Sequence, residues 1–518
     1  MIRVRFSHTV FLFLVGLLVP NLVASAVAQQ RMAPLPPPCT VGGVASAKPP
    51  ARPLRRPFSL AVLPLVVEAG AARFIFLSDG LPNAIATRIG SSIPRLFVVG
   101  RRTQHRRAAD ASALRTMGAD LGVEYILAGN VGKSGDEIRI SFELYDAQSG
   151  RRRWVRTFVF DSAGVLPIEQ ATAIEVAGRI VGQFTPAEQD GLLRVPSARH
   201  AAYESFLRGE VAADEQARSL ASDAYRRALQ IDPRFADAYA KLAMADADVL
   251  DENDMNGPAE GTRLSAEVRT ASRRATLLDS TLAVGWLAQA RELLLAGEPP
   301  ASWLQAFQHA LARDSTDPAV LAAYGIALAQ INDRARARPL LERAAVLDPN
   351  RAELWTWLGQ IAVDERRDPD ACALLNRAIV EDALYAPAWA LRALVRGRHD
   401  DLRFAWADAE TAERLGSLLL GESAAAQIDL IARDTVRARE RLTVLWQEVR
   451  DRKTVSVHEG RAVAVALLAA GDKSHALDVL ESVRPLGPRY TASLRDSTFD
   501  RLRNEPRFRT LVSTRAGP

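Results

Sequence analysis

The pattern of apolar and polar positions after residue 57 predicts a layered α/β domain. Apolar residues that stand four apart, such as Ile85 and Ile89, predict helices that lie against a sheet on one side. Between such helices come short apolar runs with the length and composition of buried strands: FSLAVLPLVV (58–67), RLFVVG (95–100) and VEYILAGNV (123–131). Strands and helices that alternate in this way are typical of an α/β layer.

The next segment predicts an antiparallel meander. EIRISFELYD (137–146) alternates strictly between apolar and polar residues, as a strand with one buried face does. Residues 154–160 predict a further strand, and a helix from 168 to 184 closes the domain.

A Gly-Lys-Ser triplet between two of these strands resembles the end of a phosphate-binding loop. Such a loop needs a glycine five residues before the Gly-Lys pair, where this chain has Leu127, and it must open onto a helix. Here a strand follows. The triplet therefore predicts a hairpin loop with Lys133 in solvent.

From about residue 202 the pattern becomes periodic. Alanines recur in register with steps of 47, 35, 34, 34 and 34 residues, at Ala228, Ala275, Ala310, Ala344, Ala378 and Ala412. A 34-residue period indicates tetratricopeptide repeats, each a pair of helices. The pattern predicts six repeats over 202–419, a degenerate stretch to about 453, a further pair around 467–483 and a terminal cap at 496–512.

The longer first step holds an acidic insertion, VLDENDMNGPAEGT (249–262). Its carboxylates suggest a calcium loop, but its glycine and glutamate do not stand at EF-hand offsets. The sequence predicts an acidic loop that lengthens one helix connection.

The start of the chain has the features of a signal peptide. Two arginines precede the apolar run TVFLFLVGLLV, and Ala26-Val27-Ala28 fits a cleavage site. We expect export to the periplasm or beyond after cleavage at Ala28. An uncleaved membrane anchor is the alternative.

Residues 29–56 are rich in proline, alanine and glycine and predict a disordered linker. Its Cys39 lies too far past the cleavage site for a lipoprotein. The only other cysteine, Cys372, falls in a predicted repeat helix, and two cysteines so far apart predict no disulfide framework.

The net charge and the candidate binding or catalytic residues change this interpretation little. The 66 basic and 61 acidic residues give a net charge of only +5, and with five lysines the chain has an arginine bias that indicates no nucleic-acid patch. The arginines at 101–102, 106–107 and 151–153 predict a solvated face or a patch for an acidic partner. No histidines stand at metal-ligand spacing, and His399-Asp400 predicts a polar loop between helices. We expect no enzyme activity, no cofactor and no metal.

Several of these motifs, taken in order, resemble the TolB-like amino-terminal domain family. They are AVLPL, FLSDGLPNAIATRI, LFVVGRRT and LGVEYILAGNVGKSGDEIRISFELYDAQSGRRRWVRTF. The resemblance implies a docking or regulatory module that precedes tetratricopeptide repeats in bacterial proteins. The chain departs from it at VVEAGAARF, where the family has a polar loop with an asparagine, so any ligand of that loop is in doubt.

The sequence thus predicts an α/β domain with a mixed sheet followed by an all-α solenoid. The expected parts are a signal peptide (1–28), a linker (29–56), the TolB-like domain (57–186), the repeats (200–490) and a carboxyl-terminal cap or tail (491–518). We expect a scaffold whose repeat groove binds envelope proteins or peptides, with membrane contact only through an uncleaved signal. The residues expected to face the partner are Ile326, Gln330, Glu353, Thr356, Gln360 and Asp364. The alternative is a regulatory module of a cyclase, kinase or transcription-regulator system held at the membrane.

Overall fold

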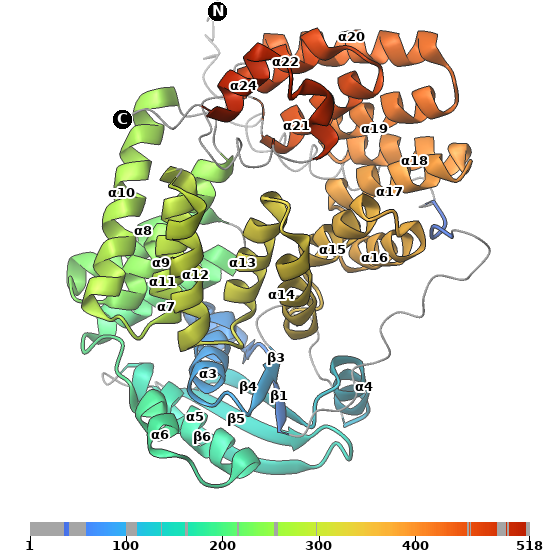
Figure 1. Ribbon diagram of the computed structural model, residues 1–518. Coiled ribbons are helices and arrows are strands. Elements are labelled where there is room, and N and C mark those ends of the chain that lie inside the picture. Colours follow the sequence, from blue (N-terminus) through green and yellow to red (C-terminus); the bar gives the residue numbers. More distant parts are fainter. Residues whose placement is uncertain are drawn as a thin grey trace, which may run out of the picture. The chain divides into compact units, whose positions relative to one another are not determined.

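A computed structural model describes most of the chain, as an α/β domain followed by paired helices (Figure 1). The described residues are 36–40, 58–99, 111–135, 137–160, 164–214, 217–252, 257–296, 298–452, 455, 457–483, 494 and 497–513. The predicted signal peptide and most of the predicted linker lie outside them. Within the described residues, every helix is too short or too polar to cross a membrane.

The amino-terminal domain has a mixed sheet, as predicted. The strand order is β3-β1-β4-β5-β6, with β2 paired to β4. β1 runs parallel to β3 and β4, while β4, β5 and β6 form the antiparallel meander. The elements are β1 (Ser59–Val62), β2 (Val66–Val67), η1 (Ala69–Phe74), α3 (Leu77–Ser92), β3 (Phe97–Val99), α4 (Ala111–Leu121), β4 (Tyr125–Ser134), β5 (Glu137–Asp146), β6 (Arg152–Phe160), α5 (Leu166–Val181) and α6 (Pro186–Leu193).

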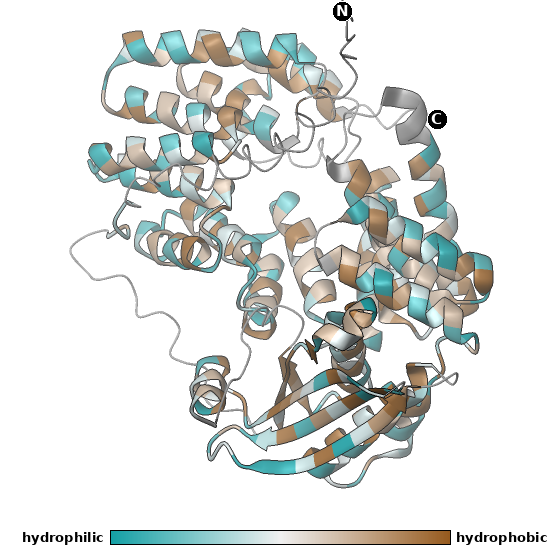
Figure 2. Ribbon diagram, turned by 180° about the vertical axis from the view of Figure 1, so that it is seen from behind, coloured by the Kyte–Doolittle hydropathy of each residue, from teal (hydrophilic) through white to brown (hydrophobic). Residues whose placement is uncertain are grey.

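Helices cover both faces of this sheet. The apolar residues of β5, among them Ile140 and Phe142, pack in one core with residues of α3 and α5. On the other face, α4 packs Leu114 and Met117 against β1 and β4. Figure 2 shows the alternation of polar and apolar residues along the strands as bands of teal and brown. The period-two pattern in the sequence predicted this burial correctly.

The Gly-Lys-Ser triplet lies in a strand. β4 continues through Ser134, the chain turns at Gly135 with φ of 62°, and β5 follows at once. The hairpin prediction is confirmed, but Lys133 is an exposed strand residue and not a loop residue, because the turn is tighter than expected.

Paired helices fill the rest of the described chain. The 34-residue spacing places each pair as predicted, from α7 onward, and these pairs form a tetratricopeptide repeat solenoid. The helices are α7 (His200–Asp214), α8 (Arg218–Ile231), α9 (Ala236–Glu252), α10 (Gly257–Leu278), α11 (Ala283–Ala296), α12 (Pro300–Arg313), α13 (Pro318–Gln330), α14 (Arg334–Leu347), α15 (Ala352–Asp364), α16 (Asp368–Glu381), α17 (Ala386–Arg398), α18 (Leu402–Arg414), α19 (Leu418–Ile431), α20 (Thr435–Asp451), α21 (Val457–Ala469) and α22 (Lys473–Ser482).

Two stretches differ from the prediction. The insertion at 249–262 is mostly helix, since α9 extends to Glu252 and α10 begins at Gly257. Pro258 is tolerated there because it stands in the first turn, where its missing N–H would have no helical partner. The stretch expected to be degenerate holds the regular pair α19–α20. After α22, η3 (Ser497–Leu502) and α24 (Pro506–Ser513) bury Phe499 and Phe508 against the last repeats, as expected of a cap.

The sheet domain and the first repeats share one hydrophobic core. A buried ionic cluster lies at this junction. Arg88 of α3 donates from Nε to Glu169 of α5 at 2.6 Å and from Nη1 to the carbonyl of Arg194 at 2.7 Å, and Tyr203 of α7 donates to Glu169. The parts predicted at 57–186 and 200–490 are therefore packed together through side chains from both.

Candidate binding surface of the repeats

The six residues predicted to face a partner lie on α13 and α15. Two of them offer little surface, because Ile326 and Thr356 are each only 8% exposed. Ile326 belongs to the apolar core of the repeats, and the hydroxyl of Thr356 donates to the carbonyl of Ala352 at 2.9 Å in its own helix. Glu353 forms an ion pair with Arg351. Gln330 is half-buried at the end of α13.

The remaining two residues take part in a polar network at the end of α15. Gln360 donates from Nε2 to Oδ1 of Asp364 at 2.7 Å, and Asp364 forms an ion pair with Arg334 of α14 at 3.1 Å. The network links neighbouring repeats.

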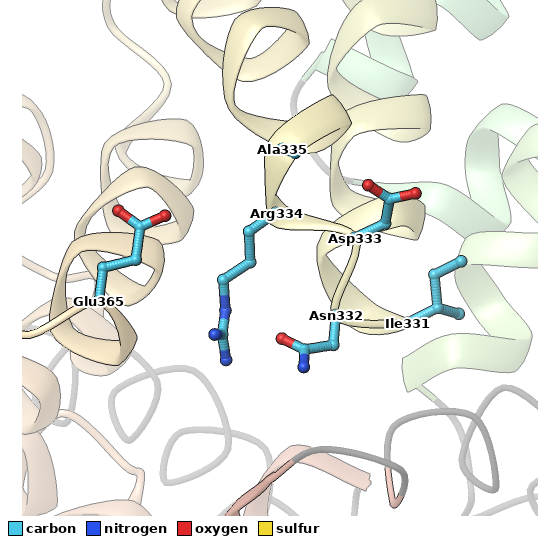
Figure 3. A pocket seen from close by; sticks show the side chains of 6 residues that line it. All are labelled: Ile331, Asn332, Asp333, Arg334, Ala335 and Glu365. Carbon is cyan, nitrogen blue, oxygen red and sulfur yellow. The ribbon is translucent and has the colours of Figure 1, made fainter.

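Arg334 also lines a shallow cavity of about 540 Å³ at the turn between α13 and α14 (Figure 3). Its guanidinium and the amide of Asn332 point into the space that Glu365, the residue just after α15, borders. Glu365 is held by Arg338 and Arg367. Partial burial opposes the shift, but the hydrogen bond from Arg367 and the charge of Arg338 lower the pKa of Glu365. The cavity therefore presents fixed charges of both signs beside the predicted residues, and it is lined by Ile331, Asn332, Asp333, Arg334, Ala335 and Glu365.

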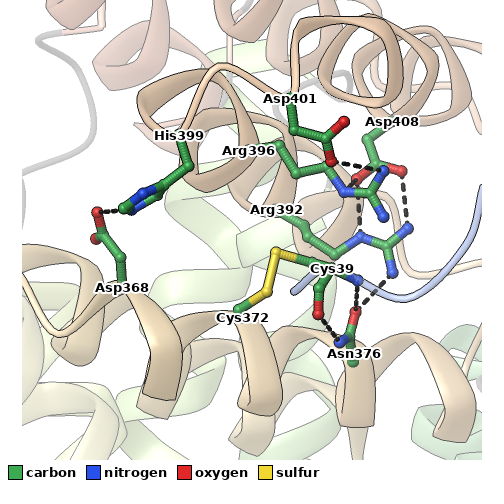
Figure 4. Close-up of a disulfide and its surroundings, with 9 residues drawn as sticks. All are labelled: Cys39, Asp368, Cys372, Asn376, Arg392, Arg396, His399, Asp401 and Asp408. Atoms are coloured by element: carbon green, nitrogen blue, oxygen red, sulfur yellow. Dashed lines mark hydrogen bonds and ion pairs between the residues drawn. A yellow bond between two sulfur atoms is a disulfide. The ribbon is translucent and has the colours of Figure 1, made fainter. Parts of the chain in front are cut away.

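A disulfide overturns the expectation for the cysteines. Cys39 and Cys372 are bonded across 333 residues of sequence, and each is 1% exposed (Figure 4). The prediction was wrong because separation along the sequence sets no limit on separation in a folded chain. Cys39, expected in a disordered linker, instead packs in a small apolar cluster with residues of α15, α16 and α17.

The backbone of Cys39 is bound by the side chain of Asn376 on α16. The Cys39 N–H donates to Oδ1 of Asn376 at 3.0 Å, and Nδ2 of Asn376 donates to the Cys39 carbonyl at 3.0 Å. Oδ1 also accepts from Nη1 of Arg392 at 2.9 Å (Figure 4). The sequence did not predict this site.

Arg392 is part of a buried ionic cluster inside the repeat α17–α18. It donates to both carboxylate oxygens of Asp408 at 2.7 Å, and Nε of Arg396 lies 3.1 Å from the same carboxylate. Burial raises the pKa of Asp408 against the opposing effect of Arg392, and burial also lowers the pKa of Arg396. A signal was present in the sequence, since Arg392 and Arg396 stand 34 residues after Leu358 and Ala362 and so break the apolar repeat pattern.

The other candidate residues have structural partners. His399 pairs through Nε2 with Asp368 at 2.9 Å, and not with Asp400. Arg152 and Arg153 form ion pairs with Glu143 and Asp146. The arginines at 101–102 and 106–107 lie outside the described residues. Within the part of the chain that the structure describes, no group of three or more potential metal ligands occurs.

Comparisons with known proteins give partial matches. The chain matches no protein-family model. It is 26% identical over 202 residues to "Putative adenylate cyclase 3" of Rhizobium meliloti (strain 1021), and the match covers 38% of this chain. The aligned part spans only 34% of that relative's length.

Solved structures also resemble the chain at low identity. One is titled "Crystal structure of YrrB: a TPR protein with an unusual peptide-binding site", with 18% identity, coverage of 38% of this chain and 93% of that one, and a TM-score of 0.28. Another is "Human IFIT1 dimer with PPP-AAAA", with 13% identity, coverage of 63% and 91%, and a TM-score of 0.39. The helix pairs and their 34-residue spacing define the repeat class.

Proposed function

We propose that the protein is an exported, non-enzymatic scaffold whose helical repeats bind protein partners. The observation that carries this proposal is the run of helix pairs from α7 to α22. Stacked pairs present one extended surface, and repeat proteins use such surfaces to hold other chains. The fixed charges around Arg334 and Asp364 suit a polar peptide segment.

The Cys39–Cys372 disulfide supports export. Disulfides persist in oxidising compartments such as the bacterial periplasm and are rare in the cytosol. The predicted signal peptide agrees with this. Mass spectrometry of the mature protein tests it, because export with cleavage gives a chain that starts at Gln29, whereas an intact Met1 favours the membrane-anchored alternative.

For the sheet domain we propose a docking role. The resemblance of residues 57–186 to the TolB-like amino-terminal domain supports it, and so does the core that the sheet shares with the first repeats. Because of that shared core, deleting the repeats would expose apolar surface on the sheet domain. Point substitutions are the better test.

The decisive experiment compares partner recovery after crosslinking in cell envelopes. A variant with Gln360→Ala and Asp364→Ala removes the network beside the cavity and should lose recovered partners at least about tenfold, as expected for one or two lost polar contacts. Val380→Ser, at an α16 position that is 76% exposed, is the matched control and should retain them. Equal recovery from both variants would place the binding surface elsewhere or overturn the scaffold.

A second candidate is a regulatory module of a signalling system. The observation that favours it is the match to a protein named as an adenylate cyclase. This function requires the repeats to face the cytoplasm. Cysteines of cytoplasmic proteins are normally reduced, so trapping thiols in intact cells and finding Cys39 and Cys372 free would favour this candidate over export.

A further inference from the structure

The surroundings of Cys39 have the features of a peptide-binding site. The residue is buried against three successive helices, and its apolar neighbours come from α15, α16 and α17. They are Ala362, Val363, Ala371, Cys372, Leu375, Leu391 and Val395. A segment far away in the sequence is therefore bound between repeats, as a ligand would be.

Asn376 recognises this segment through its backbone. One side-chain amide both accepts the N–H and donates to the carbonyl of the same residue, each at 3.0 Å. A residue in an extended strand presents its N–H and C=O on the same side, which is how strands pair in sheets. Such a contact selects for an extended backbone and leaves the side chain to be selected by the apolar cluster around Cys372.

The amide is oriented by residues of the next repeat. Nη1 of Arg392 donates to Oδ1 of Asn376 and so fixes which end of the amide is the acceptor. Arg392 is 2% exposed and donates to both carboxylate oxygens of Asp408, which is fully buried. The recognition group is thus preorganised by the interior of the next repeat, which lowers the entropy cost of binding.

We propose that Asn376, Arg392 and Cys372 form a site for an extended peptide segment with a small side chain, and that Cys39 of the same chain occupies and closes it while the disulfide is intact. This deepens the proposed scaffold function and rests on it, since it names one site and the form of segment that fits there. A dithiol opens the site. It supplies two electrons and two protons, the Cys39–Cys372 bond breaks, both residues become thiols, and the dithiol becomes a disulfide.

The test uses the full-length chain with Cys39→Pro. This substitution removes the Cys39 sulfur and the backbone N–H at that position and leaves the site open to an added peptide. The probe is a peptide with the sequence of residues 34–44, whose cysteine is activated as a mixed disulfide with thiopyridine. The Cys372 thiolate attacks this disulfide, bonds to the peptide sulfur and releases pyridinethione, which is followed by absorbance.

The control is the same peptide with a methyl group on the amide nitrogen of its cysteine. We expect the unmethylated peptide to label Cys372 about tenfold faster, the effect of one hydrogen bond. Asn376→Leu, which nearly keeps the size of the side chain but removes the Oδ1 that accepts the cysteine N–H, should abolish most of the preference. Equal rates for the two peptides would overturn the site while leaving the scaffold function untouched, because no natural partner enters this assay.

A second measurement keeps the proposal testable if Cys39→Pro fails to fold. The wild-type chain is reduced and its disulfide is allowed to re-form with an excess of a small-molecule disulfide. Asn376→Asp should slow this closure about tenfold relative to wild type. An unchanged rate would show that Asn376 does not hold the segment.

Discussion

Two neighbouring repeats of the solenoid share a backbone plan but differ in the chemistry of their interiors. In α15–α16, Leu358 and Ala362 on the first helix face the second in an apolar interior. Gly359 allows the two helices to approach closely, since a Cβ there would lie 2.9 Å from the side chain of Leu375.

In α17–α18, the residues 34 positions later form a buried ionic cluster. Arg392 replaces the leucine and Arg396 the alanine, and Asp408 stands where α16 has Leu374. Trp389 and Phe404 lie against the two guanidiniums, with ring centroids at 4.7 Å and 5.3 Å from Cζ. A guanidinium above an aromatic face gains a cation–π interaction.

The 34-residue period determines where the two helices of a repeat contact each other. It does not determine whether the residues buried between them are apolar or charged. The small residues at Ala371, Ala378, Ala405 and Ala412 are common to both repeats and permit the same helix packing. Buried charges tend to weaken a core unless each finds a partner. We attribute the buried charges of α17–α18 to the orientation of Asn376, because apolar side chains could not orient this amide.

The largest effect should come from breaking the ionic interior. Asp408→Ala leaves two buried guanidiniums without their shared carboxylate and should lower the free energy of unfolding by about 4 kcal/mol. The triple variant Arg392→Leu, Arg396→Ala and Asp408→Leu copies the neighbouring repeat and should lose less than about 2 kcal/mol. Urea denaturation of both variants measures this. If the triple variant were less stable than Asp408→Ala, an apolar interior could not replace the ionic cluster in this repeat.

The disulfide should give the next largest effect. Cys372→Ser frees the amino-terminal segment from α16 and should lower the free energy of unfolding by about 3 kcal/mol, since the bond closes a loop of more than three hundred residues. Calorimetry with and without a reductant checks this. Reductant should destabilise the wild type and leave Cys372→Ser unchanged, and a response of both proteins alike would contradict the assignment.

Helix packing at the equivalent positions 359 and 393 should give the next effect, of the same sign in both repeats but from different physical causes. Gly359→Ala should destabilise by about 2 kcal/mol despite the better helix propensity of alanine, because the added methyl meets Leu375. Its counterpart Ala393→Gly should also destabilise, by at least about 1 kcal/mol, through the lower helix propensity of glycine and the loss of a buried methyl group. Thermal unfolding monitored by circular dichroism distinguishes the two. If Gly359→Ala stabilised the protein instead, the helices α15 and α16 would be far enough apart to accommodate a methyl group.

The smallest expected effect is a dependence of stability on pH. It should differ between the buried Asp408 of the repeats and Glu188 of the sheet domain. A hydrogen bond from Arg95 and one from the backbone of Thr185 lower the pKa of Glu188 from 4.5 to about 2. Its contribution to stability is therefore present above pH 4.5 and lost as the pH falls toward 2. Burial raises the pKa of Asp408, so its contribution is lost as the pH rises through that raised value.

Urea denaturation between about pH 3 and about pH 6 tests these opposite signs. The stability difference between wild type and Glu188→Gln should shrink as the pH falls. The difference between wild type and Asp408→Asn should shrink as the pH rises. Parallel slopes would contradict the contrast between the pair of Glu188 with the partly exposed Arg95 and the ionic cluster buried inside a repeat.

Much of the fold could be predicted because it rests on local periodicity. The strict alternation in β5 and the 34-residue spacing of the repeats each follow from geometry within a few turns of chain. The regular pair α19–α20 was missed because its sequence departs from the repeat pattern, while packing against its neighbours still forms it. Of the candidate surface, Gln360 and Asp364 were predicted to face a partner, which stays a prediction, while their network with Arg334 and the burial of Ile326 and Thr356 were not predicted.

The sequence by itself determined the two kinds of architecture, since hydrophobic period and turn residues act over short distances. Only the tertiary structure decided that Cys39 meets Cys372 and that Arg392 fixes the amide of Asn376. These contacts join residues on different helices, and in the disulfide residues 333 apart, so no local pattern encodes them. They arise because stacking the repeats brings side chains of successive helices within hydrogen-bond distance and gathers the apolar residues of three helices against which Cys39 is buried.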